Sequence, residues 1–179
     1  IGSTWQGGQY VRTRDVEACK AAFDDLLMRL HVDHVELGMM HYIDDLDELR
    51  RCLDGPYRDL VESYKAQGVI RHIGMSTHSA TCGTYAVEQQ AVEMMLFSVN
   101  PAYDMQPGSY DIGALTSSAD AQFAGFDRDR LEFYRACERA DVGITVMKAF
   151  AGGRLLSADS SPFGVALTPA MCIHYALTR

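Results

Sequence analysis

Residues His34 to Asp45 read HVELGMMHYIDD, and the interpretation of the whole chain starts from this stretch. Its centre, Val35 to Met40, is a short and largely apolar run, which is typical of a buried strand in a parallel sheet. Such a strand delivers His41 and Tyr42 to its carboxyl end, where parallel α/β folds place their chemistry. His41 is therefore a candidate catalytic group, although a single His after an apolar run is more often structural.

The sequence on both sides predicts an alternation of helices and strands. Residues 1–12 are expected to form a loop or the tail of a strand. Strands are expected at 35–40, 69–75, 94–99 and 143–147, and helices at 13–31, 44–54, 56–68, 79–90, 127–140 and 168–179. Alternation at this pitch indicates βαβ units and a parallel sheet.

Helical spacing of apolar residues indicates which faces are buried. The first helix shows a stripe made of Cys19, Phe23, Leu26, Leu27 and Leu30. The helix at 127–140 is expected to bury Leu131, Tyr134 and Cys137. Two long connections, 101–126 and 148–167, follow strands rather than helices, on the side where barrel enzymes carry their function.

Composition excludes several classes of protein. The chain has 179 residues, of which 47% are hydrophobic and 22% charged, and this suits one globular domain. A net charge of −8 argues against nucleic acid or an anionic membrane as the main partner. No apolar run has the roughly 18 residues that a membrane span needs, and the N-terminus does not look like a secretory signal.

Cysteines and histidines give little support for a disulfide framework or a metal site. The five cysteines are widely scattered and include no CxxC pair, which favours reduced thiols in a cytoplasmic protein. His72 and His78 are the nearest approach to a ligand pair, but six residues is not a helical-face spacing. We expect no metal; a barrel hydrolase with a metal on His41, His72 and His78 remains an alternative.

Three segments carry a family resemblance. They are GMMHYID at 38–44, VIRHIGMSTHS at 69–79 and ITVMKAFAGGRLL at 144–156. With these motifs the chain resembles the aldo-keto reductase family, in register across essentially all 179 residues. It looks most like the branch whose members often carry a C-terminal iron–sulfur segment, although this sequence contains no such cysteine cluster. The resemblance implies a (β/α)₈ barrel that reduces carbonyl compounds with a nicotinamide cofactor.

The resemblance assigns roles to the residues after the first predicted strand. His41 matches the family's His, which hydrogen-bonds the carbonyl oxygen of the substrate. A neutral imidazole donor there would stabilise the negative charge that develops as hydride arrives. Tyr42 stands where the family often has a Trp that packs on substrate; a packed aromatic at the rim of the barrel is an equally good interpretation.

The resemblance also implies cofactor contacts, with NADP or NAD. Ser76 matches the residue that holds the nicotinamide carboxamide, and Thr77 stands where the family commonly has Asn. Both residues are alternatively plain loop and helix-start residues. Met147, followed by Lys148, falls where many members place a Tyr that stacks on the nicotinamide ring, and Phe97 stands in place of a Gln. The loop near the pyrophosphate is matched by Gly152, Gly153, Arg154 and Leu155, although such a run is often only a flexible turn.

The family's proton-donating Tyr, its Lys and its Asp have no counterparts here. They would lie upstream of Ile1, and the eighth strand would follow Arg179. A full barrel takes about 250 residues, so we expect residues 1–179 to form one partial barrel domain with four to five of the eight strands, part of a longer enzyme. Alone it should be poorly catalytic, because general acid catalysis contributes roughly 10² to 10⁴-fold.

Two classes of function follow from these patterns. The first is an oxidoreductase that uses NAD(P)H to reduce an aldehyde or ketone, a small-molecule carbonyl substrate. The second is a non-catalytic half-barrel that serves as a binding or assembly module, which the departures at Thr77, Phe97 and Met147 favour. In either case open sheet edges are expected to promote self-association.

Overall fold

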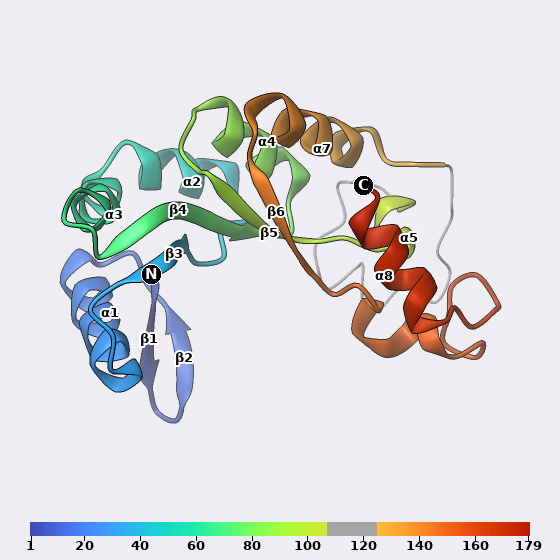
Figure 1. The fold of residues 1–179 in the computed structure, drawn as a ribbon, viewed down its shortest axis with the longest axis horizontal. Helices are drawn as coiled ribbons and strands as arrows, with labels where there is room; N and C mark the ends of the chain where they lie inside the picture. The colour runs from blue at the N-terminus through green and yellow to red at the C-terminus, as the bar shows by residue number, and fades with distance from the viewer. Residues whose placement is uncertain (107–124) are drawn as a thin grey trace.

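The computed structural model describes residues 1–106 and 125–179. In these residues four parallel strands form one sheet in the order β3-β4-β5-β6. The strands are β3 (Val35–Met40), β4 (Ile70–Thr77), β5 (Met94–Ser98) and β6 (Gly143–Met147). The sheet forms an open arc in the described part, with helices along its outer side (Figure 1). The predicted partial α/β barrel with four to five parallel strands is therefore confirmed.

The predicted helices lie close to where the sequence places them. They are α1 (Val16–Leu30), α2 (Leu46–Leu53), α3 (Pro56–Ala66), α4 (Ala80–Glu88), α7 (Arg128–Ala140) and α8 (Pro169–Leu177). Two short helices lie within the predicted connections and were not expected, namely α5 (Pro101–Asp104) and the 3₁₀ helix η1 (Ala151–Leu156). Asp15, rather than Thr13, caps α1, because its carboxylate accepts a hydrogen bond from the backbone of Ala18. The middle of the predicted connection at 101–126 lies outside the described residues.

The first twelve residues contain an antiparallel hairpin, where the sequence predicts a loop or the tail of a strand; the loop is wrong, and the strand is one of a pair. Its strands are β1 (Ser3–Gln6) and β2 (Gln9–Arg12), joined by Gly7 and Gly8. Both glycines have positive φ, 56° and 84°, as a tight two-residue hairpin turn requires. Because the strands have only four residues each, their alternation is too brief to stand out in the sequence.

The buried face of α7 differs from the predicted one. Its buried residues are Arg130, Phe133, Ala136 and Cys137, whereas Leu131 and Tyr134 are only partly buried. The face is rotated because Arg130, a residue type that is rarely buried, lies inside. Similarly, Leu26 and Leu30 of the predicted stripe on α1 are 40% and 55% exposed, while Cys19, Phe23 and Leu27 are buried.

Register aligns the carboxyl ends of the four strands. Met40 pairs with Met75, Thr77 with Phe97 and Ser98 with Met147. Beyond β3, the backbone of Ile1 continues the pairing at the same end: it donates to Met39 O at 2.7 Å and accepts from the His41 amide at 2.8 Å. No helix in the described ranges is long and apolar enough to cross a membrane.

At the opposite end of the sheet, Glu93 predicts a pH-dependent contribution to stability. Burial alone would raise the pKa of Glu93, but hydrogen bonds from Lys65, His72 and the Ile73 amide outweigh it and hold the pKa at about 2. A carboxylate with a lowered pKa stabilises the fold above its unfolded value of 4.5, and this contribution disappears as the pH falls towards 2. Urea denaturation of Glu93→Gln should therefore show a loss of under about 1 kcal/mol at pH 6, since the group is partly exposed, and a smaller one at pH 3.

The exposed Glu138 on α7 provides the matched control. The loss in the free energy of unfolding should differ less between pH 6 and pH 3 for Glu138→Gln than for Glu93→Gln. A Glu93→Gln loss that grows as the pH falls would contradict the assignment.

Candidate active site

Four polar residues follow the four parallel strands at the carboxyl end of the sheet. His41 follows β3, His78 follows β4, Asn100 lies two residues after β5, and Lys148 follows β6. Because the strands are parallel and in aligned register, these residues lie at the same end of the sheet. Hydrogen bonds described below join Lys148 to His78 and to Asn100.

The turn that carries His41 and Tyr42 is held by arginines from the N-terminal segment. The guanidinium of Arg14 donates to the carbonyl oxygens of His41 at 2.8 Å and Tyr42 at 2.9 Å, and Arg12 donates to Tyr42 O at 3.1 Å. The Tyr42 amide donates to Ser76 Oγ at 2.7 Å. Tyr42 has a φ of 51°, a left-handed conformation that non-glycine residues rarely adopt and that these four hydrogen bonds stabilise.

The imidazole of His41 is exposed and its pKa is lowered. Desolvation is the largest cause, and positive charges of the N-terminus, Arg14 and Arg12 add to it. A lowered pKa favours the neutral ring at neutral pH, and a neutral imidazole has one N–H to donate. This charge state suits the role that the family resemblance suggests for His41.

Asp44 is the centre of a second set of contacts. Its Oδ1 accepts from Thr77 Oγ1 at 2.8 Å and from the His78 amide at 2.6 Å, while Oδ2 lies 2.9 Å from His78 Nδ1. Burial alone would raise the pKa of Asp44, but the hydrogen bonds from His78 and Thr77 outweigh it and lower the pKa. The carboxylate is therefore ionised, and it fixes the orientation of the His78 ring.

The His78 ring connects Asp44 to Lys148. Lys148 Nζ lies 2.7 Å from His78 Nε2. Because Nδ1 faces a carboxylate, it carries the ring proton, and Nε2 is then an acceptor. Burial lowers the pKa of Lys148, with an opposing contribution from Asp44. The backbone of Lys148 has a left-handed φ of 55°, and its carbonyl accepts from Asn100 Nδ2 at 2.9 Å.

The structure buries both predicted carboxamide contacts. Ser76 is 6% exposed, and its hydroxyl accepts from the Tyr42 amide, which leaves the hydroxyl proton for another acceptor. Thr77 is fully buried, and its hydroxyl donates to Asp44. Thr77 therefore has to give up an internal hydrogen bond before it donates to any ligand.

The predicted ring and pyrophosphate contacts come from β6 and η1. Met147 and Arg154 are half-buried, whereas Leu155 is fully buried in a small apolar cluster with Tyr103 and Cys172. Gly152 and Gly153 have positive φ values of 68° and 92°. A Cβ placed on either glycine would have no neighbour within 4 Å, so their backbone borders open space.

Sequence reasoning missed Asp44 and Asn100 as site residues and treated His78 only as a possible metal ligand. A signal for Asp44 was present: two aspartates precede α2, and only Asp45 is its cap, accepting from the Glu48 amide at 2.7 Å. The suggested metal set does not assemble, because His72 pairs with Glu93 near the start of β4 while His78 follows its end. No group of three or more potential ligands occurs in residues 1–106 and 125–179.

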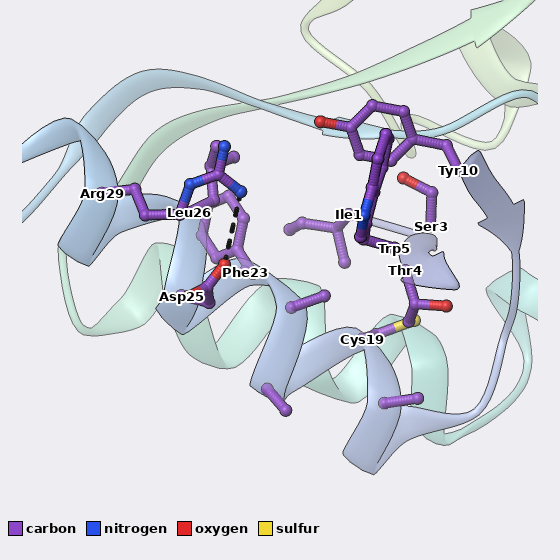
Figure 2. Close-up of a pocket in the computed structure, with 13 residues that line it drawn as sticks. Ile1, Ser3, Thr4, Trp5, Tyr10, Cys19, Phe23, Asp25, Leu26 and Arg29 are labelled. Atoms are coloured by element: carbon purple, nitrogen blue, oxygen red, sulfur yellow. Dashed lines mark ion pairs between the residues drawn. The ribbon is translucent and has the colours of Figure 1, made fainter. Parts of the chain in front are cut away.

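A groove of about 410 Å³ lies between the hairpin and α1, away from these residues. Figure 2 shows Trp5 and Tyr10 from the hairpin on one side and Phe23, Leu26 and the Asp25–Arg29 ion pair from α1 on the other. None of the predicted site residues lines this groove. Its lining is mostly apolar, and it carries no titratable cluster comparable to Asp44, His78 and Lys148.

Comparisons with known proteins agree with the fold. The model of the aldo/keto reductase family matches residues 8–166. Similar solved structures include the holo form of aldo-keto reductase AKR11C1 from Bacillus halodurans, with 20% identity, a TM-score of 0.57 and coverage of 87% of this chain and 43% of that one. The glycerol dehydrogenase AKR11B4 from Gluconobacter oxydans has 16% identity, a TM-score of 0.54 and coverage of 95% and 44%.

A third structure, from Pseudomonas aeruginosa and described as that of an aldo-keto reductase, has 19% identity and a TM-score of 0.61, with coverage of 99% of this chain and 62% of that one. At these identities the likeness concerns the fold alone. The chain thus spans about two fifths to three fifths of the length of these structures. A comparison with curated protein sequences gives no match.

Proposed function

The chain belongs to the aldo/keto reductase family, and from this premise we propose that it takes part in the NAD(P)H-dependent reduction of an aldehyde or ketone. The observation that carries the proposal is the placement of His41. Its ring is exposed at the carboxyl end of β3, its pKa is lowered, and its backbone is fixed by Arg14. An exposed neutral imidazole on a rigid turn is suited to bind a carbonyl oxygen.

His41 would act on the oxygen of the substrate. A reduced nicotinamide, when bound, would supply the hydride for the carbonyl carbon, and negative charge would develop on the carbonyl oxygen. The N–H of His41 donates to that oxygen and stabilises the charge more strongly in the transition state than in the bound substrate. Tyr42, whose ring lies 6.2 Å from that of His41, would pack against the substrate.

The residues around η1 fit a bound dinucleotide. Gly152 and Gly153 present backbone beside open space, which suits close approach of a pyrophosphate, and Arg154 supplies a cation nearby. Ser76 keeps a hydroxyl proton for the carboxamide. Five free, buried cysteines support our further proposal that the protein works in the reducing cytoplasm.

His41→Ala tests the proposed role, because alanine has no side-chain donor. We expect carbonyl-dependent NAD(P)H oxidation by the purified longer enzyme, of which residues 1–179 are expected to form part, to fall by about 10² to 10³-fold, as when one donor to a developing oxyanion is removed. The Kd for NADPH, measured by fluorescence titration, should change less than about twofold, because His41 contacts the substrate and not the cofactor.

The exposed His174 on α8 provides the matched control. His174→Ala should leave the rate of NAD(P)H oxidation within about twofold of the wild type. A wild-type rate in His41→Ala would reject the assignment of His41.

One observation favours the second candidate, a non-catalytic half-barrel. The hydroxyl of Thr77 is fully buried and donates to Asp44, at the position where the family commonly contacts the carboxamide. The same fluorescence titration separates the two functions. A Kd for NADPH below 1 mM favours the reductase. Absence of NADPH binding at 1 mM favours the non-catalytic half-barrel.

A further inference from the structure

The contact between Lys148 and His78 has no role in the proposed reduction. Lys148 follows β6 and His78 follows β4, so the lysine side chain extends past the end of the intervening strand β5 to place Nζ 2.7 Å from Nε2. The two residues are 70 positions apart in the sequence. Both are partly buried, and His78 has only 12% of its side chain exposed.

The His78 ring is oriented so that it can accept a proton from Lys148. Asp44 holds Nδ1 at 2.9 Å and also accepts from the His78 amide at 2.6 Å, so both the ring and its backbone are fixed. A carboxylate next to Nδ1 stabilises the imidazolium that forms when Nε2 takes up a proton. In this arrangement His78 is the base, Asp44 orients its ring, and Lys148 provides the amine.

The other lysines of the sequence lack such a base. The chain contains three lysines, at positions 20, 65 and 148. Lys20 is exposed on α1, and Lys65 forms an ion pair with Glu93. Partial burial favours the neutral amine, because it costs the charged ammonium its solvation. Burial does lower the pKa of Lys148.

We propose that Lys148 is a nucleophilic amine that forms a reversible imine with aldehydes or ketones, and that His78 is the base that accepts its proton. The ligands are small carbonyl compounds, because the amine lies at the carboxyl edge of the sheet beside the aromatic ring of Tyr42, which is 5.2 Å from that of His78. Lysine amines in this state are the usual imine-forming groups of enzymes.

The reaction balances without a cofactor. The lone pair of Nζ attacks the carbonyl carbon, and the π electrons of the C=O bond move to oxygen. A proton leaves Nζ for His78 Nε2, while the alkoxide oxygen takes up a proton from the solvent to give a neutral carbinolamine. His78 then returns its proton to the hydroxyl group, which leaves as water as the nitrogen lone pair forms the C=N bond, and the product is a protonated imine. Asp44 stays ionised and stabilises the imidazolium between these steps.

Reductive trapping tests the proposal. The full chain at pH 7 is treated with propanal and sodium cyanoborohydride, and the alkylated lysines are quantified by peptide mapping over time. We expect Lys148 to be modified at least about tenfold faster than Lys20 and Lys65, a conservative figure for assistance by a general base. The rate at Lys148 should also level off at a lower pH than the rate at Lys20. Equal rates at the three lysines of the folded protein would overturn the proposal.

Variants identify the base. His78→Gln keeps a polar side chain but accepts no proton, and it should reduce the rate at Lys148 to that at Lys20. Asp44→Asn should reduce it in the same direction, and Lys65→Arg should leave it unchanged. An undiminished rate in a folded His78→Gln, checked by circular dichroism, would remove His78 from the mechanism. Should His78→Gln not fold, Asp44→Asn decides the same point. No nicotinamide is used, so the result does not depend on the proposed reduction.

Discussion

Arg130→Met is expected to lower the free energy of unfolding by about 3 to 5 kcal/mol, the usual effect of removing one partner of a buried ion pair. Arg130 Nε donates to Asp104 Oδ1 at 2.6 Å, and both side chains are at most 4% exposed. Methionine has a similar apolar stem, but it leaves the Asp104 carboxylate buried without its counter-charge.

Asp104 makes the loss large because it connects several elements. Tyr134 of α7 donates to Oδ1 at 2.7 Å, and Tyr175 of α8 donates to Oδ2 at 2.9 Å. Arg130 also donates to the carbonyl of Ser98 at the end of β5, and its guanidinium lies 4.5 Å from the centre of the Phe97 ring. One ion pair thus ties α5, α7 and α8 to the sheet.

Urea denaturation measures the change, with Arg139→Met on the same helix as the matched control. Arg139 pairs with Glu132 at 2.6 Å, but both side chains are about half exposed, so the loss there should be much smaller than the loss at Arg130. Adding Asp104→Asn to Arg130→Met should cost less than the sum of the two single changes, because the buried charge disappears. Equal losses for Arg130→Met and Arg139→Met would contradict the structural role.

The strand from Met94 to Ser98 was predictable because burial on both faces of a parallel sheet leaves a plain apolar run. Gly143 to Met147 is also mostly apolar, although Gly143 and Thr145 are exposed, and the sequence places both strands within one residue. The face of α7 was not predictable from apolar spacing, because its first buried position is Arg130. Only the tertiary contact with Asp104 makes that position an interior one.

The candidate site divides in the same way. The position of His41 follows from local sequence alone, since an apolar strand ends directly before it. The contact between His78 and Lys148 does not, because it depends on the register of three strands and joins residues 70 positions apart. The spacing of residues within one sequence does not predict a contact between residues so far apart. The sequence therefore indicates which strand ends carry polar groups, and the fold decides which of these groups touch.

Phe133→Ala is the second change with a large expected effect, a loss of about 3 to 5 kcal/mol in the free energy of unfolding. The Phe133 ring is fully buried between α7 and α4, with its centre 4.4 Å from that of Phe97. It packs so closely on Gly83 that a Cβ added there would lie 2.5 Å from the ring. Phe126→Ala removes the same atoms at a 42% exposed position and should cost less than about 1 kcal/mol.

Gly83 makes this test specific, because the effect of Gly83→Ala on the free energy of unfolding should change sign between the wild type and Phe133→Ala. In the wild type, Gly83→Ala should be destabilising, since the new methyl group meets the Phe133 ring. In Phe133→Ala the ring is gone, and Gly83→Ala should then stabilise the protein by up to about 1 kcal/mol, as Ala replaces Gly within a helix. The same sign in both backgrounds would show that the two helices do not meet at this point. Helix α4 begins two residues after His78, so the helix that carries this contact follows the proposed base directly in the chain.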